Sequence, residues 1–185
     1  AEAARRGVRF IEDSRDPEPT EGAGTMALEL LTFPEPLDTL FVPLGNGAML
    51  AGIATIARAL MPQARVVAVA ASGAPAMVES LQSGTFVTHE RIATIADGIG
   101  VRIPVPEALR DLAGLVDDYV LVPDSSILTA MKLLHLHAGI VAEPSGAVGL
   151  AGIMQESPRL QGQTIATIVC GGNLTLTQMR EWLRD

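Results

Sequence analysis

The chain has 185 residues with 13 basic and 21 acidic side chains, and its net charge of −8 makes a nucleic-acid partner unexpected. Hydrophobic residues make up 48% and charged residues 18%, which excludes a disordered chain and predicts one domain over residues 1–185. The sequence shows neither an apolar run long enough for a membrane span nor a secretory signal, so we expect a soluble cytoplasmic protein with no membrane partner.

Short runs rich in valine and isoleucine alternate with segments of helical period, which is the pattern of an α/β domain. The runs are almost continuously apolar, as is typical of strands buried on both faces. We therefore expect a mostly parallel central sheet with helices on both faces. The predicted strands are 8–11, 39–43, 66–70, 119–122 and 164–169.

Apolar residues at helical spacing predict four helices between and after these strands. The first covers about 49–60 and stops before Pro62, and the second covers 125–138 and ends at Gly139. The other two cover about 145–155 and about 175–182.

Two segments are predicted to be irregular. Residues 12–22 are charged and rich in proline, which indicates an exposed loop. Residues 84–105 form a connection that is long for a compact domain, and such segments are often functional or mobile. We expect residues 84–105 to lie over or beside a site.

Residues 41–53 combine a strand, a glycine-containing turn and a helix, which directs backbone N–H groups and the positive helix end at one place. Gly45 and Gly47 allow an anion such as phosphate to approach, and Asn46 tolerates left-handed backbone geometry. By itself, such a turn is more often a plain strand–helix connection. The residues expected for a dinucleotide site or a nucleotide-hydrolysing P-loop are not found in the sequence.

Two further residues carry possible chemistry. Cys170 ends an apolar strand before two glycines, at the strand end where ligands sit in α/β sheets, although a lone cysteine is more often simply buried. Glu143 lies in a tight turn, where it either needs partners or marks the start of a helix. One cysteine cannot form an internal disulfide, and no zinc-binding pattern is present.

Four segments occur together along the chain in the order 41–53, 94–104, 139–150 and 168–173. The combination is far more specific than any one of them. The chain resembles the carboxyl-terminal, large-domain part of fold-type II pyridoxal-phosphate-dependent lyases, the group of threonine dehydratase, serine dehydratase and serine racemase. The resemblance runs from residues 21–31 to 170–176. It implies pyridoxal 5'-phosphate as the cofactor. It also implies α-proton abstraction and β-elimination from serine, threonine or a similar β-hydroxyamino acid, giving a 2-oxo acid and ammonia.

The resemblance also implies residue roles. The family's glycine-rich phosphate loop corresponds to 45–49, where Asn46 and Ala48 replace two glycines usual in the family. Cys170 takes the place of the serine or cysteine that hydrogen-bonds the pyridine nitrogen, and Glu143 matches a glutamate near the ring. The implied cofactor-binding residues are Gly45, Asn46, Gly47, Ala48, Met49, Glu143, Cys170, Gly171, Gly172 and Asn173.

No catalytic residue is expected in this chain, because the family's Schiff-base lysine lies in an amino-terminal half that these 185 residues do not match. The single lysine, Lys132, falls near the polar side of its helix and is most simply exposed to solvent. Some relatives bind a divalent cation at positions that correspond to Ala70 and Ala76, which cannot act as ligands, so no metal is expected.

The sequence therefore indicates a fragment that is inactive alone and forms a homodimer or associates with the missing half. Two alternatives remain open at this point. One is a non-catalytic domain that binds pyridoxal phosphate or another anion, and the other is a structural or interaction module with no phosphate ligand.

Overall fold

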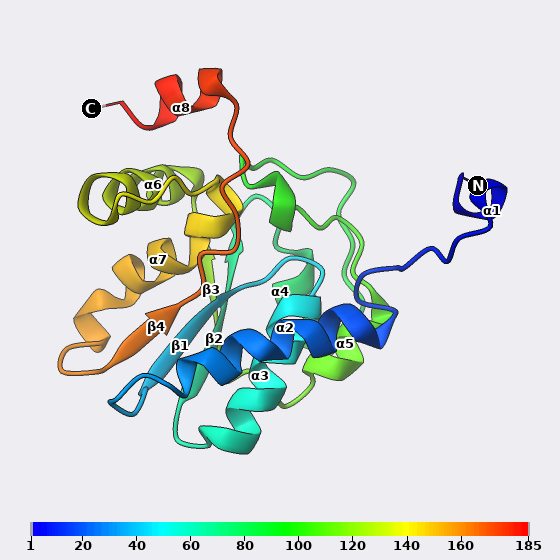
Figure 1. Ribbon diagram of the computed structural model, residues 1–185, viewed down its shortest axis with the longest axis horizontal. Coiled ribbons are helices and arrows are strands. Elements are labelled where there is room, and N and C mark those ends of the chain that lie inside the picture. The colour runs from blue at the N-terminus through cyan, green and yellow to red at the C-terminus, as the bar shows by residue number, and fades with distance from the viewer. Residues whose placement is uncertain (1, 185) are drawn as a thin grey trace.

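Four parallel strands form the central sheet of the computed structural model, which describes residues 2–184 (Figure 1). The sheet order is β3-β2-β1-β4, so β1 is paired on both sides. Leu40 of β1 is in register with Val66 on one side and with Ala166 on the other. The strands are β1 Thr39–Pro43, β2 Arg65–Ala71, β3 Asp118–Val122 and β4 Ile165–Thr167.

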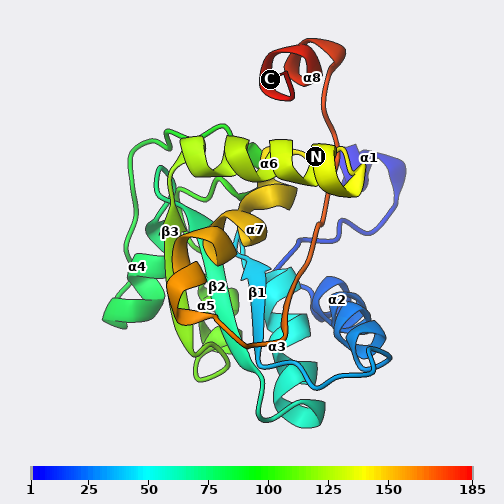
Figure 2. The ribbon, with the colours of Figure 1, turned by 90° about the vertical axis from the view of Figure 1, so that its left-hand side faces the viewer.

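Helices cover both faces of the sheet, as predicted, and Figure 2 shows α7 in front of it with α3 and α5 behind. Successive β1 side chains enter different cores: Leu40 and Val42 pack with α3 and α5, whereas Phe41 packs with α6 and α7. The helices are α1 Glu2–Arg6, α2 Pro17–Leu30, α3 Ala48–Leu60, α4 Ala76–Ser83, α5 Pro106–Leu112, α6 Asp124–Ala138, α7 Pro144–Glu156 and α8 Leu176–Trp182.

The connections change face between β1 and β4. The chain passes from β1 to β2 through α3 and from β2 to β3 through α4 and α5, all on one face. It passes from β3 to β4 through α6 and α7 on the opposite face. The carboxyl ends of β1 and β4 therefore meet at a topological switch point, which is where open α/β sheets bind their ligands.

The predicted strand at 8–11 is wrong. These residues form an extended connection between α1 and α2, and Val8, Phe10 and Ile11 are 57%, 71% and 54% exposed. An apolar run needs a neighbouring strand to complete its hydrogen bonds, and none of the described residues supplies one. In Figure 1 this connection carries α1 away from the body of the protein.

The predicted loop at 12–22 is also wrong in its second half, because α2 begins at Pro17. Proline suits the first turn of a helix, where its missing N–H has no partner to lose, and the acidic Glu18 complements the helix dipole. Packing of α2 along α3 stabilises the helix. The two helices approach so closely that a Cβ at Gly52 would lie 2.0 Å from the Thr20 carbonyl oxygen.

The long segment 84–105 is irregular, as predicted, apart from the short 3₁₀ turn η1 at Asp97–Ile99. Asp124 at the start of α6 fixes it by accepting hydrogen bonds from Thr94 Oγ1 at 2.6 Å and from the Ile95 N–H at 3.0 Å. These contacts hold η1 against the start of α7. Within residues 2–184, none of the helices is sufficiently long and apolar to cross a bilayer.

Candidate functional site

A cavity of about 350 Å³ opens at the carboxyl ends of β1 and β4. Its walls are α2, the turn after β1, the starts of α3 and α7, the turn η1 and Cys170, three residues beyond the end of β4. The structure brings seven of the ten residues predicted to bind a cofactor to this cavity, although they lie far apart in the sequence. These seven are Gly45, Asn46, Gly47, Ala48, Met49, Glu143 and Cys170.

The turn before α3 presents unused backbone donors to the cavity. The Ala48 N–H donates to Ser14 Oγ at 3.1 Å and to Asn46 Oδ1 at 3.3 Å. Within residues 2–184, the N–H groups of Gly45, Gly47 and Met49 have no hydrogen-bond acceptor. Unpaired N–H groups at the positive end of a helix attract an anion. We call the backbone of residues 45–50 the cradle.

Two glycines of the cradle are required by its shape. Gly47 has φ +108°, which disfavours other residues, and a Cβ there would lie 3.0 Å from the Ala108 Cβ. A Cβ at Gly45 would lie 3.1 Å from the Ile99 Cα. The cradle is therefore packed between α5 and η1.

Cys170 follows β4 and contributes its thiol to the opposite wall. The Sγ atom lies 3.8 Å from the carbonyl oxygen of Ser145, the second residue of α7. Although Cys170 as a residue is exposed, partial burial of its thiol raises the pKa of Cys170, and the nearby Glu143 charge raises it further. The side chain is therefore a neutral thiol near pH 7, suited to hydrogen bonding rather than to nucleophilic attack.

Glu143 holds the segment that follows Cys170. Its backbone N–H donates to the Gly171 carbonyl at 3.0 Å, and its Oε2 accepts the Asn173 N–H at 2.7 Å. The approach is so close that a Cβ at Gly171 would lie 2.6 Å from Glu143 Oε1, and one at Gly172 would lie 2.5 Å from the Val141 carbonyl oxygen.

The remaining three predicted residues do not line the cavity. Gly171, Gly172 and Asn173 run past the Glu143 side chain, and Asn173 borders a separate small cavity beside α8. Their place is next to the site, where they position Cys170 and Glu143.

Among the lining residues that were not singled out from the sequence, Asp13, Gly98 and Ser145 bear most directly on the chemistry of the site. Asp13 reaches the cavity from the segment before α2, and Gly98 reaches it from η1. Ser145 is only 3% exposed, and its hydroxyl has no partner among the described residues. A Cβ at Gly98 would lie 2.8 Å from Ser145 Oγ. The prediction that residues 84–105 lie beside a site was the one signal that pointed toward Gly98.

Comparison with known proteins supplies the family. Residues 1–171 match the family model described as pyridoxal-phosphate dependent enzyme. The chain belongs to this family. It is 32% identical over 180 residues to the biosynthetic L-threonine dehydratase of Pasteurella multocida, covering 96% of this chain and 35% of that protein. It is 34% identical over 176 residues to the corresponding dehydratase of Bacillus subtilis, covering 93% of this chain and 41% of that protein.

Solved structures of the family share the fold. Maize serine racemase superimposes with a TM-score of 0.88 at 31% identity, covering 97% of this chain and 57% of that one. Processed threonine deaminase isoform 2 from Solanum lycopersicum superimposes with a TM-score of 0.90 at 27% identity, covering 97% of this chain and 50% of that one. The chain spans between about a third and three fifths of the length of these relatives.

The residues of the cavity fit the family's cofactor. The cradle offers unpaired N–H donors of the kind that bind phosphate, and Asn46 and Ala48 leave those donors in place although they replace two glycines. The neutral Cys170 thiol at the other wall can hydrogen-bond a ring nitrogen. Ser145 adds a buried hydroxyl without a partner in the described chain.

Other candidate groups lie elsewhere. Lys132 is half-buried on α6, less exposed than the sequence indicated, and it does not line the cavity. Ala70 and Ala76 are both buried. Among residues 2–184 no group of histidine, cysteine and carboxylate side chains is arranged to hold a metal ion.

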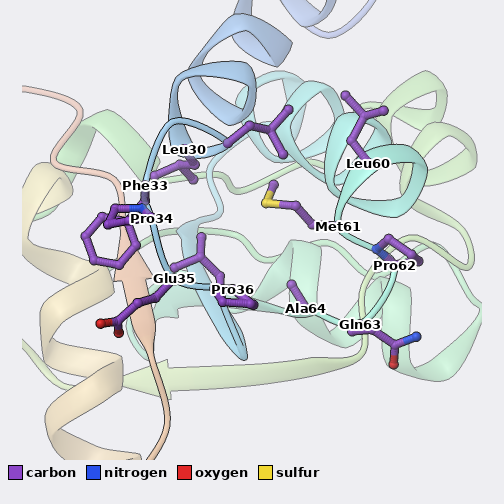
Figure 3. Close-up of a pocket in the computed structure, with 12 residues that line it drawn as sticks. Leu30, Phe33, Pro34, Glu35, Pro36, Leu60, Met61, Pro62, Gln63 and Ala64 are labelled. Atoms are coloured by element: carbon purple, nitrogen blue, oxygen red, sulfur yellow. The ribbon is translucent and has the colours of Figure 1, made fainter.

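A second cavity, of about 390 Å³, lies at the opposite end of the sheet between the α2–β1 connection and the end of α3 (Figure 3). Apolar side chains such as Leu30, Phe33 and Met61 line most of it, and Glu35 and Gln63 supply its polar side chains. These residues offer packing surface but no converging donors, so the cavity at the switch point is the candidate site.

Proposed function

We propose that this chain supplies the cofactor-binding part of a pyridoxal-phosphate-dependent ammonia-lyase acting on serine, threonine or a similar β-hydroxyamino acid. The observation that carries the proposal is that the cradle and the neutral Cys170 thiol face one cavity at the switch point. Relatives named as L-threonine dehydratases support this reaction class. The products are a 2-oxo acid and ammonia.

The cradle binds the phosphate group of the cofactor. Backbone N–H groups of residues 45–50 and the positive end of α3 supply this binding, because none of the described side chains lining the cavity is basic. The rigid packing of Gly45 and Gly47 fixes the direction of the donors. The phosphate is therefore held by backbone hydrogen bonds and the positive end of α3 rather than by ion pairs.

Cys170 hydrogen-bonds the pyridine nitrogen without keeping a proton on it. A carboxylate in this place would stabilise a protonated ring, whereas a neutral thiol does not. When bound, pyridoxal phosphate withdraws electrons from an attached amino acid, so that the α-proton becomes acidic and a β-hydroxyl can be expelled. The thiol makes this withdrawal milder, which suits elimination of a β-hydroxyl.

The amine that attaches the cofactor comes, in this proposal, from outside residues 1–185. Lys132 on α6 does not line the cavity. Within the described chain β4 pairs only with β1, so its other edge has no neighbouring strand. Phe33, which is 52% exposed, lines a groove together with Ile165 and Ala166 of β4. An unpaired apolar edge accepts further strands. The partner is either the amino-terminal half of the family fold or a second copy in a homodimer.

A cytoplasmic location belongs to the same proposal. The one cysteine is a free thiol at the site rather than part of a disulfide, and free thiols persist in reducing compartments.

The proposal is tested by mixing this chain with the part of the Bacillus subtilis dehydratase that lies outside the match, with pyridoxal phosphate present. We expect a co-eluting complex to release 2-oxo acid from L-threonine or L-serine, and the chain alone to release none. Cys170→Ala lowers the rate, whereas the matched control Lys132→Ala leaves it unchanged. A co-eluting complex that binds the cofactor but releases no 2-oxo acid contradicts the proposal and favours the non-catalytic binding domain.

A further inference from the structure

The cavity proposed to bind an anion carries two negative side chains and, among the described residues, no positive one. These side chains are Asp13 and Glu143. The Glu143 carboxylate already accepts a hydrogen bond from the Asn173 N–H at 2.7 Å. Asp13 forms no ion pair within residues 2–184. Its carboxylate is therefore an uncompensated charge.

The arginines near Asp13 are occupied by other carboxylates. Arg9 binds Asp16 and Glu18, with N–O distances of 2.6 Å to each. Arg15 binds Glu12 at 2.5 Å and lies 3.7 Å from Glu107. Neither arginine lines the cavity.

Asp13 is connected directly to the cradle. Its Oδ2 accepts a hydrogen bond from Asn46 Nδ2 at 2.5 Å, and Asn46 Oδ1 accepts the Ala48 N–H. The next residue, Ser14, is only 4% exposed, has φ +66° and also accepts the Ala48 N–H. These contacts hold the carboxylate two hydrogen bonds away from a donor of the cradle. Asn46, one of the departures from the family's glycines, is the residue that makes this connection.

We propose that Asp13 sets the affinity of the cradle for phosphate by placing a fixed negative charge at its rim. The inference rests on the proposed function, because it concerns the ligand of the same cavity. The Asp13 side chain is exposed, so solvent screens part of its charge, but like charges at the rim of one cavity still repel and oppose the binding of a phosphate group in the cradle. The native site then holds its phosphate ligand more weakly than a neutral rim would.

The test compares Asp13→Asn with the control Glu29→Gln, which removes the same charge near the other end of α2, where the side chain lines a different groove. Asparagine keeps the shape and an oxygen acceptor for Asn46. The ligands are 4'-deoxypyridoxine 5'-phosphate, which lacks the reactive aldehyde, and uncharged pyridoxine. We expect Asp13→Asn to tighten binding of the phosphate ester about three- to tenfold in 20 mM salt, and the more distant Glu29→Gln to leave it within about twofold.

Salt separates a charge effect from a structural one. The gain in Asp13→Asn should shrink at 0.5 M salt because the repulsion is screened, and pyridoxine binding should not change with the substitution. Equal phosphate affinities in the native chain and in a folded Asp13→Asn overturn the inference and leave the proposed function standing. Absence of phosphate binding in both, with cooperative unfolding preserved, overturns both.

Discussion

Glu143 Oε2 accepts the backbone N–H of Asn173 at 2.7 Å, which ties the start of α7 to the chain leaving β4. Cys170 lies three residues before Asn173, so the same contact helps to fix the thiol at the cavity wall. Gly171 leaves room for this carboxylate because it has no Cβ. A Cβ at Gly171 would lie 2.6 Å from Glu143 Oε1. Glu143 therefore lines the cavity and also positions the neighbouring Cys170 in the same wall.

Removal of the Glu143 carboxylate should loosen this wall. Glu143→Ala leaves the Asn173 N–H without its charged acceptor, and we expect the free energy of unfolding to fall by about 1–3 kcal/mol. Glu143→Gln keeps an oxygen acceptor of the same shape and should cost about half as much. Urea unfolding of both variants measures the difference. Equal stability of Glu143→Ala and the native chain would show that the contact is not significant.

A side chain at Gly171 should disrupt the same contact. Gly171→Ala places a Cβ against Glu143, and we expect a loss of about 1–3 kcal/mol. The control is Gly22→Ala in α2, where a Cβ meets nothing within 4 Å. Because alanine is the better helix former, the control should gain about 0.5–1 kcal/mol. Thermal unfolding monitored by circular dichroism distinguishes the two, and a gain at Gly171 would contradict this packing.

Strain in the cradle should reduce ligand binding as well as stability. Gly47→Ala forces alanine to φ +108° at the phosphate donors, whereas Gly139→Ala forces it to φ +66° at the end of α6 with nothing within 4 Å. Each should lower the free energy of unfolding by about 1–2 kcal/mol. We expect only Gly47→Ala to weaken binding of 4'-deoxypyridoxine 5'-phosphate, by about tenfold or more. Isothermal titration calorimetry provides the affinities, and equal losses in both variants would place the phosphate elsewhere.

The reactivity of Cys170 should follow its raised pKa. Burial keeps the thiol protonated to a higher pH than in a free thiol, so the thiolate fraction at pH 7.5 is smaller and alkylation by iodoacetamide is slower than for glutathione. The rate should rise as the pH passes the raised pKa, and a bound phosphate ester should protect the thiol. Mass spectrometry of the alkylated protein follows both effects. An inflection below that of glutathione would mean that the thiol is an activated nucleophile.

Much of the sheet could be predicted because its two central strands, β1 and β2, are buried on both faces. The strands at 39–43, 66–70 and 119–122 carry continuous apolar runs, and the structure places β1, β2 and β3 there. The run at 8–11 has the same local character but no neighbouring strand among the described residues. Pairing is decided by tertiary structure, which a single apolar run does not reveal.

The site could be predicted only where a local sequence motif marks its residues. Glycines before a helix and a cysteine after a strand are visible as motifs, and the switch point brings both to one cavity. Asp13 and Ser145 reach the cavity through tertiary packing, and nothing in their local sequence marks them. The helix α2, which positions Asp13, was hidden because its first residues are charged and rich in proline.

The most direct test of the central claim is a ¹H–¹⁵N NMR titration of the chain with 4'-deoxypyridoxine 5'-phosphate, which binds without forming a covalent bond to lysine. We predict saturable shifts concentrated in the amides of Gly45, Gly47, Met49 and Cys170, with little change at Lys132. Shifts that do not saturate, or that gather at the apolar cavity near Met61, would contradict the assignment of the cradle as a phosphate site.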